Sequence, residues 1–101
     1  MKIESFNTNL LVSDIPELSA TAATELRDDV RAALEPSHQT LEVNLSRTVF
    51  VDSSGLGVLI ALHKLMSQRG GRLHLVNPSH GVQQVLELTR LHQVLEIVKK
   101  G

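Results

Sequence analysis

The chain has no cysteine, tryptophan or tyrosine, and Phe6 and Phe50 are its only aromatic residues. Without cysteine there can be no disulfide, no thiolate nucleophile and no cysteine-ligated zinc, which is typical of a reducing compartment, and we expect a cytoplasmic protein. Two phenylalanines provide no platform on which the bases of a single-stranded nucleic acid could stack. The net charge at pH 7 is only −1, so no basic excess favours nucleic acid or an anionic membrane as a partner.

Long apolar runs are also missing. The longest, Val58 to Leu62, is far shorter than the roughly 20 residues of a membrane-spanning helix, so we expect no membrane insertion. Residues 1–9 lack the apolar core and cleavage site of a signal peptide. The hydrophobic content of 42% and charged content of 21% over 101 residues are ordinary for a globular protein, and we expect one domain over residues 1–101.

The apolar residues that are present follow alternating strand and helix patterns. Gly70-Gly71 and Glu35-Pro36 are helix stops, and Asn77-Pro78-Ser79 is a turn that can cap a helix. Strands that alternate with helices of this length indicate an α/β fold with a mixed, mostly parallel sheet on which helices pack. The patterns predict strands within residues 3–12 and at 41–45, 48–51, 72–76 and 92–98, and helices at 19–34, 54–68 and after Ser79.

The most informative segment, Asp52 to Gly57, joins the predicted strand 48–51 to the apolar helix that follows. The first N–H groups of a helix have no partner within the helix and make that end partly positive. Short polar side chains cap such an end, so Asp-Ser-Ser-Gly is a good helix start that requires no function. A phosphate on one of the serines would also lie where anions are favoured. A regulatory serine is therefore a hypothesis beside the purely structural interpretation.

Motifs of catalysis and of cofactor binding are absent. Neither Ser53 nor Ser54 has the two flanking glycines of a nucleophile elbow. The pair Gly55-x-Gly57 lacks the third glycine of a dinucleotide fingerprint, and no Gly-Lys-Ser/Thr follows it. We expect no enzymatic activity, no cofactor and no metal site. The five histidines show no zinc-site spacing and are predicted to be exposed or half-buried: His38, His63, His74, His80 and His92.

The helix behind the serines has two apolar faces. Its spacing places the wider face against the sheet, and that face comprises Val58, Leu62, Leu65 and Met66, with Leu59 at its margin. Leu56 and Ile60 point to the opposite side, and Ser53 projects onto the same side near Ile60. Another element could cover these residues, or they could be ordinary exposed apolar side chains. The alternative is a docking surface that a phosphate on Ser53 would disable.

From residue 48 onward the chain resembles a STAS domain of the anti-sigma-factor antagonist family. The resemblance depends on Val51-Asp52-Ser53-Ser54-Gly55-Leu56-Gly57-Val58-Leu59, on Gly70-Gly71-Arg72-Leu73, and on Asn77-Pro78-Ser79 with Val82, Leu86 and Thr89-Arg90-Leu91. Weaker similarity reaches the N-terminus. The Asp-Ser-Ser-Gly-Leu-Gly core is the most specific part.

The resemblance implies a partner-switching cycle. In this family a serine kinase, which is itself the anti-sigma factor, phosphorylates the serine after the aspartate, and that serine corresponds to Ser53. The unphosphorylated protein binds the anti-sigma factor and frees the sigma factor; a PP2C-type phosphatase restores this form. The binding surface would comprise Asp52, Ser53, Ser54, Leu56, Gly57 and Ile60.

The chain departs from the family at two places. Pro16-Glu17-Leu18-Ser19 stands where the family has Gly-Glu-Leu-Asp, so Ser19 replaces an aspartate. We expect no equivalent, after Val98, of the final helix that many members carry. The alternative function is that of a non-switching STAS subunit in a larger assembly, such as a lipid-transport complex or a stressosome-like scaffold. The sequence does not determine the oligomeric state.

Overall fold

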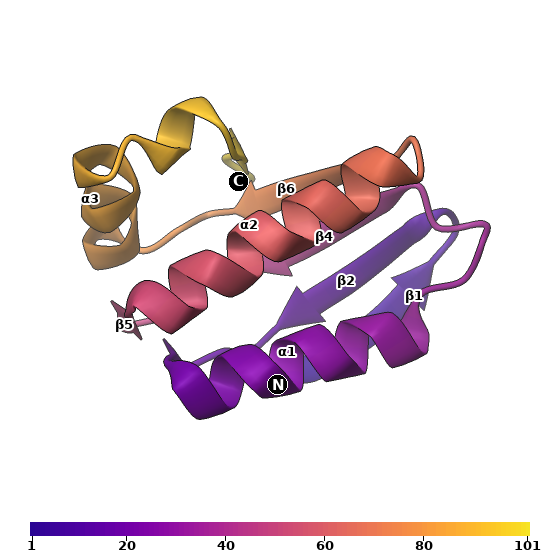
Figure 1. Cartoon of the computed structure of the whole chain (residues 1–101), viewed down its shortest axis with the longest axis horizontal. Helices are drawn as coiled ribbons and strands as arrows, with labels where there is room; N and C mark the ends of the chain where they lie inside the picture. Colours follow the sequence, from indigo (N-terminus) through magenta and orange to yellow (C-terminus); the bar gives the residue numbers. More distant parts are fainter.

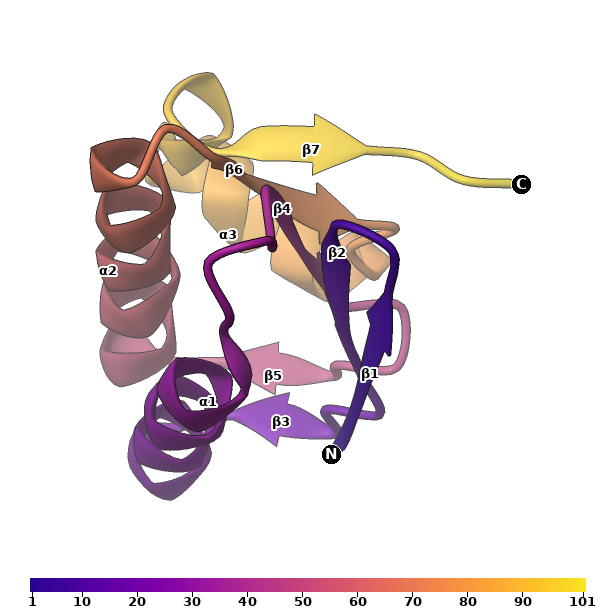
Figure 2. The ribbon, with the colours of Figure 1, turned by 90° about the vertical axis from the view of Figure 1, so that its right-hand side faces the viewer.

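The computed structural model describes residues 1–101, which form a two-layer α/β domain. Helices α1 and α2 lie side by side on one face of a five-stranded sheet (Figures 1 and 2). The strand order in the sheet is β1-β2-β4-β6-β7. The bounds are β1 Lys2–Phe6, β2 Asn9–Ser13, β4 Thr40–Asn44, β6 Arg72–Val76, β7 Glu96–Val98, α1 Ala20–Ala33, α2 Ser53–Gln68 and α3 His80–Leu88.

The sheet is mixed and mostly parallel, which confirms the predicted fold class. β1 pairs antiparallel with β2, and the remaining neighbours pair in parallel. Leu10, Leu41 and Leu73 are in register on three adjacent strands and are almost completely buried. Leu26 and Val30 of α1 are completely buried in the same core. Burial of these apolar side chains fastens the helices to the sheet.

The structure confirms the helix caps and stops that the sequence predicts. Gly70 has a φ of 75° just beyond α2, a left-handed conformation that glycine adopts without steric cost. Ser79 is the N-cap of α3, and its Oγ accepts a hydrogen bond from the Val82 backbone N–H at 3.4 Å. No helix in the structure is both long and apolar enough to cross a bilayer.

The predicted strand 48–51 is shorter than expected and does not belong to the main sheet. Only Phe50–Val51 forms a strand, β5, and it pairs in parallel with Glu17–Leu18, the strand β3. β3 was not predicted, because two residues are too few to show an alternating pattern. After β4, the Leu45 backbone N–H still donates a hydrogen bond to the Val76 carbonyl. The chain then leaves the sheet in a turn, which is closed by a hydrogen bond from the Thr48 N–H to the Leu45 carbonyl.

The prediction of one strand over residues 92–98 is wrong for its first half. Leu91–Gln93 forms a 3₁₀ turn, and Val94 is also helical. The backbone N–H groups of Val94 and Leu95 donate to the Leu91 carbonyl at 3.0 and 2.8 Å. Hydrogen bonds within the turn therefore satisfy these backbone N–H groups, and pairing with β6 begins only at Glu96. β7 is the last element of the structure.

Burial on α2 and at one histidine also differs from the expectation. Leu59, placed at the margin of the core face, is completely buried, whereas Leu65 is only half-buried. Leu56 does not point away from the core but packs partly against it. His38, expected to be exposed or half-buried, is only 3% exposed. Its Nε2 is hydrogen-bonded to Ser5 Oγ, and its Nδ1 accepts from the Glu35 backbone N–H. Because both ring nitrogens have partners, this polar ring can be buried.

Candidate functional site

The small β3–β5 sheet makes the two long helices begin next to each other. Leu18 and Val51 are register partners at its carboxyl edge. The next residues, Ser19 and Asp52, are the N-caps of α1 and α2, and the two helices then run in the same direction (Figure 1). The prediction that Ser53 follows the carboxyl end of a strand is thus confirmed, although the strand belongs to the small sheet. Two partly positive helix ends meet at this point.

Asp52 holds the turn in place. Its Oδ1 accepts a hydrogen bond from the Gly55 backbone N–H at 2.9 Å, and its own backbone N–H donates to the Leu18 carbonyl at 3.2 Å. The carboxylate therefore caps α2 while the backbone ties the cap to β3. Asp52 is half-buried and already engaged within the fold. Its partner-binding role stays a prediction, and its contribution to the fold is direct.

The two glycines of the turn have different surroundings. A Cβ atom on Gly55 would lie 2.1 Å from the Leu18 carbonyl oxygen, so only glycine lets β3 pass this close to α2. A Cβ atom on Gly57 would meet nothing within 4 Å. A glycine inside a helix costs about 0.8–1 kcal/mol relative to alanine. Nothing inside the protein explains the glycine at position 57, and its open side faces outward.

The predicted switch residue is on the surface. Ser53 and Ser54 are both exposed at the first turn of α2. Gly57 is exposed and Ile60 is half-buried one and two turns further along, so the structure leaves this side of the helix accessible. Ser54 also lines a hollow of about 310 Å³ between α1 and α2, together with Arg27. A protein partner can therefore reach the serines and the helix behind them at the same time.

Two apolar residues at this turn were missed from the sequence. Val49 is 80% exposed and Phe50 is 51% exposed, immediately before the buried Val51 and the cap Asp52. The run 48–51 indicates a buried strand, and that interpretation assigns every apolar side chain in it to the core. The available signal was the position of Phe50, one of only two aromatic residues, directly before the serine turn. Aromatic side chains are enriched at protein interfaces and often act as anchors there.

Buried hydrogen bonds connect the turn to the rest of the protein. The Thr48 hydroxyl is fully buried and donates to the Ile15 carbonyl at 2.6 Å. The Thr48 carbonyl in turn accepts from Ser79 Oγ at 2.6 Å, which links the start of α3 to the same loop. The Val49 backbone N–H donates to the Pro16 carbonyl at 2.9 Å. The exposed serines consequently stand on a rigid support.

The site shows no arrangement typical of a metal centre. Across the molecule, no three His, Asp or Glu side chains lie close enough together to hold a metal ion. The features at the turn are an exposed hydroxyl, partly positive helix ends, exposed apolar side chains and a glycine open to the outside. These features suit recognition by another protein.

Comparisons with known proteins identify relatives of the whole chain. A sequence model of the STAS domain matches residues 2–100. The anti-sigma F factor antagonist of Paenibacillus polymyxa is 28% identical over 88 residues, which cover 82% of this chain and 75% of the relative. The anti-sigma-B factor antagonist of Bacillus subtilis is 26% identical over 99 residues, which cover 98% and 90%.

Solved structures share the fold. The anti-sigma factor antagonist SpoIIAA in its unphosphorylated form superposes with a TM-score of 0.83 at 23% identity, covering 99% of this chain and 87% of that one. The Bacillus protein SpoIIAA has also been solved in a phosphorylated form, and that structure superposes with a TM-score of 0.75 at 22% identity, covering 99% and 90%. At these identities the likeness establishes the fold.

Proposed function

This chain belongs to the STAS domain family, and we propose that it is an anti-sigma factor antagonist switched by phosphorylation of Ser53. Its unphosphorylated form binds a serine-kinase anti-sigma factor, and the phosphorylated form does not. The observation that carries the proposal is the exposed Ser53 at the first turn of α2, on a turn that Asp52 and Leu18 hold rigid. The names of the relatives from Paenibacillus and Bacillus support the same assignment.

The modification itself needs only access to the hydroxyl. The kinase transfers the γ-phosphoryl group of ATP to Ser53 Oγ. The new bond is between Oγ and phosphorus, the bond to the bridging oxygen of ADP breaks, and a base of the kinase takes the hydroxyl proton. The chain supplies no catalytic group to this step. A phosphatase reverses it by hydrolysis, which returns the serine and releases inorganic phosphate.

The added charge explains the loss of binding. A phosphate brings about −1.5 to −2 charges next to the Asp52 carboxylate and beside Gly57 and Ile60, in the middle of the proposed interface. Burying that charge against a partner costs desolvation energy unless a cation compensates it. A penalty of only about 2.7 kcal/mol lowers the affinity 100-fold. One phosphate can supply this penalty without any change of fold.

The test combines modification and binding. A candidate anti-sigma-factor kinase is incubated with the protein and ATP, and the modified residue is mapped by mass spectrometry. Binding is then measured for wild type, Ser53→Ala and Ser53→Asp, with Ser67→Asp as the matched control, because it makes the same change at an exposed serine of α2 outside the proposed surface. We expect label on Ser53 only, binding by Ser53→Ala and by the control, and a roughly 100-fold loss for Ser53→Asp.

Three results would contradict the proposal. Wild-type affinity of Ser53→Asp for the kinase would show that charge at this position does not control binding. Label on Ser54 in place of Ser53 would move the switch to the other serine. Stable co-purification with a multi-subunit complex, independent of kinase and ATP, would instead indicate the scaffold function.

A further inference from the structure

The surface between α1 and α2 forms a groove with a hollow at each end, which we call the α1–α2 groove. The hollow near the start of the helices is lined by Ala20, Arg27, Ser54, Gly57 and Ala61, among others, and holds about 310 Å³. The hollow at the far end is lined by Leu34, Leu65, Gln68 and Arg69, among others, and holds about 650 Å³. The groove thus begins at the serine turn and follows both helices to their ends.

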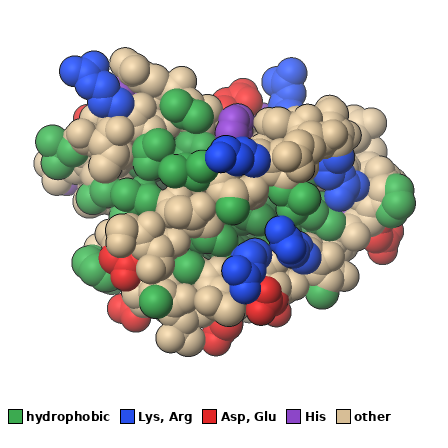
Figure 3. Space-filling model, in the orientation of Figure 1, with side chains coloured by type: hydrophobic (Ala, Val, Ile, Leu, Met, Phe, Trp, Pro, Cys, Tyr) green, Lys and Arg blue, Asp and Glu red, His purple; other side chains and the backbone are tan.

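Basic side chains follow the groove along its whole length. Arg27 and Arg69 line its two hollows, while Arg31 and Lys64 lie between them, one helical turn beyond Arg27 and Ala61. Figure 3 shows Lys and Arg side chains gathering on this face between the two helices, with most Asp and Glu side chains toward its rim. α2 contains no acidic residue. Positive charge is thus concentrated on this face, although the net charge of the whole chain is −1.

These cations are largely free to bind another molecule. Arg31 and Lys64 are exposed and belong to none of the ion pairs in the structure. Arg27 pairs with Asp28 at 3.2 Å, but both side chains are about half exposed or more, and such a pair is worth little. Arg31 and Lys64 therefore carry charge that no ion pair within the protein neutralises.

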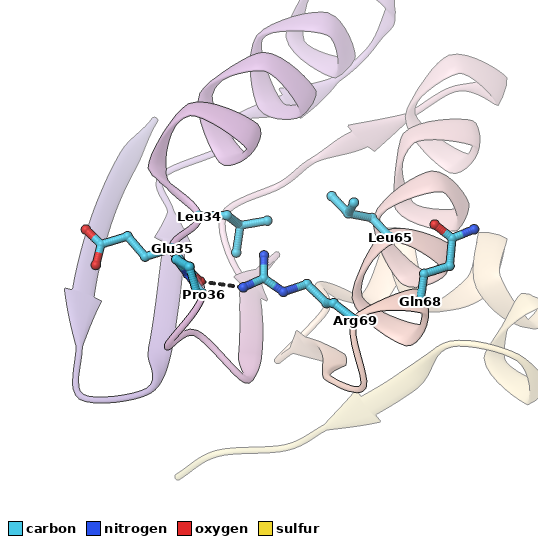
Figure 4. A pocket seen from close by; sticks show the side chains of 6 residues that line it. All are labelled: Leu34, Glu35, Pro36, Leu65, Gln68 and Arg69. Carbon is cyan, nitrogen blue, oxygen red and sulfur yellow. Dashed lines mark hydrogen bonds between the residues drawn. The ribbon is translucent and has the colours of Figure 1, made fainter.

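The far hollow adds apolar walls to this charge. In Figure 4, Leu34 of the α1 end and Leu65 of α2 face the hollow from opposite sides, and Arg69 reaches across it. The Arg69 guanidinium donates to the Glu35 carbonyl, which holds it at the edge of the hollow. The Glu35 carboxylate points away from this space. An apolar side chain flanked by a carboxylate would fit such a hollow.

We propose that the α1–α2 groove binds an acidic amphipathic helix of the partner protein. This inference depends on the proposed function, because the groove starts at Ser54 and continues the surface that Ser53 controls. Carboxylates on the partner helix would meet Arg27, Arg31 and Lys64, and an apolar residue would enter the hollow between Leu34 and Leu65. The small residues Ala20, Gly57 and Ala61 let the two backbones approach closely.

The same groove explains how one phosphate acts beyond its immediate contacts. A phosphate at the first turn of α2 adds negative charge at the mouth of the groove, where an acidic helix would have to lie. Like charges placed together across an interface oppose association by several kcal/mol. Attraction along the groove and repulsion at its mouth then act on the same partner segment.

The experiment measures binding of the anti-sigma-factor kinase used for the Ser53 test. Arg31→Glu, Lys64→Glu and their double variant reverse charges that have no structural partner, and Lys64→Gln removes one charge without reversing it. Lys99→Glu is the matched control for each single reversal, because it makes the same change in net charge on the C-terminal tail, which lies far from α1 and α2 (Figure 2). Each variant is first checked for an unchanged unfolding midpoint in urea.

We expect the double reversal to weaken binding by about 30-fold or more, each single reversal by less, Lys64→Gln least, and Lys99→Glu by less than about twofold. Raising the salt concentration should weaken wild-type binding and have little effect on the double variant, because salt screens exposed charges.

Three results would overturn the inference, each in a different way. If the double reversal binds as wild type while Ser53→Asp does not, the groove is not the docking site and the Ser53 switch stands. If wild type does not bind the kinase at all, both proposals fall. If wild type self-associates in sedimentation experiments and the double reversal does not, the occupant is the acidic face of a second copy, and the assignment to a partner helix is wrong.

Discussion

At the scale of single residues, the turn contains two glycines with opposite physical settings. Gly55 is buried, and its missing side chain makes room for the Leu18 carbonyl of β3. Gly57 is exposed in the same helix and has open space where a side chain would be. The first glycine is therefore required by the fold, whereas the second lowers helix stability without any gain inside the protein. The sequence does not distinguish the roles of Gly55 and Gly57; the atoms around each residue do.

Alanine at each position tests this difference. Gly55→Ala should lower the free energy of unfolding by about 2–3 kcal/mol or prevent folding, because a Cβ atom would collide with backbone. Gly57→Ala should raise it by up to about 1 kcal/mol, because alanine favours the helix. Urea unfolding monitored by circular dichroism measures both. Equal destabilisation by the two substitutions would disprove the distinction.

At the scale of elements, the site depends on how two helices start. Asp52 caps α2 through its carboxylate, whereas the Ser19 side chain makes no capping bond on α1 and instead donates from its Oγ to Glu17 Oε1 at 3.3 Å. The Asp52 carboxylate therefore caps its helix directly, whereas the Glu17 carboxylate reaches the start of α1 only through the Ser19 hydroxyl. The order of the first turn of α2, which presents Ser53, depends on this one cap.

Asp52 variants separate the cap from its charge. Asp52→Ala removes the acceptor for the Gly55 N–H and should cost about 1 kcal/mol of stability, within a range of about 0.5–2. Asp52→Asn keeps an acceptor in the same place and should recover most of that loss. Thermal unfolding of both variants tests the expectation. An unfolding midpoint of Asp52→Ala equal to that of wild type would show that the cap is not important for stability.

At the scale of the whole molecule, α1 and α2 cover one face of the sheet, and a polar cluster lies on the other. Glu42 in the middle of β4 is only 9% exposed. Its carboxylate accepts from Asn9 Nδ2 at 3.2 Å and from Lys100 Nζ at 2.7 Å. Glu42 lies between Leu41 and Val43 of the apolar core, and alternation along β4 places it on the opposite side of the sheet. Asn9 of β2 and Lys100 beyond β7 both contact this carboxylate, and no local pattern indicates these contacts.

The Glu42–Lys100 pair should therefore be stronger than a surface ion pair. A double-mutant cycle with Glu42→Gln and Lys100→Met should give a coupling free energy of about 1–2 kcal/mol, because the carboxylate is shielded from water. The control cycle on Lys2 and Glu4, which are 3.5 Å apart and both well exposed, should give less than about 0.5 kcal/mol. Equal coupling in both cycles would refute the claim.

Much of the local structure was predictable because it depends on neighbours in the chain. Ser19, Ser79 and Gly70 begin or end helices through contacts within a few residues, and the strands β4 and β6 show their patterns directly. The Asp52-Ser53 turn was recognisable for the same reason. The extent of β7 was mispredicted, because a local turn at Leu91–Gln93 competes with pairing to β6, and the sequence pattern does not show which one prevails.

The sequence by itself determined the α/β class, the order of most elements and the helix start that carries Ser53, since caps, stops and apolar spacing act over short distances. Only the tertiary structure decided the pairing of β3 with β5, the exposure of Phe50 and the row of cations between α1 and α2. Each of these depends on segments far apart in the chain being brought together. Contacts of that kind follow from packing of the whole domain and leave no periodic signal in either segment alone.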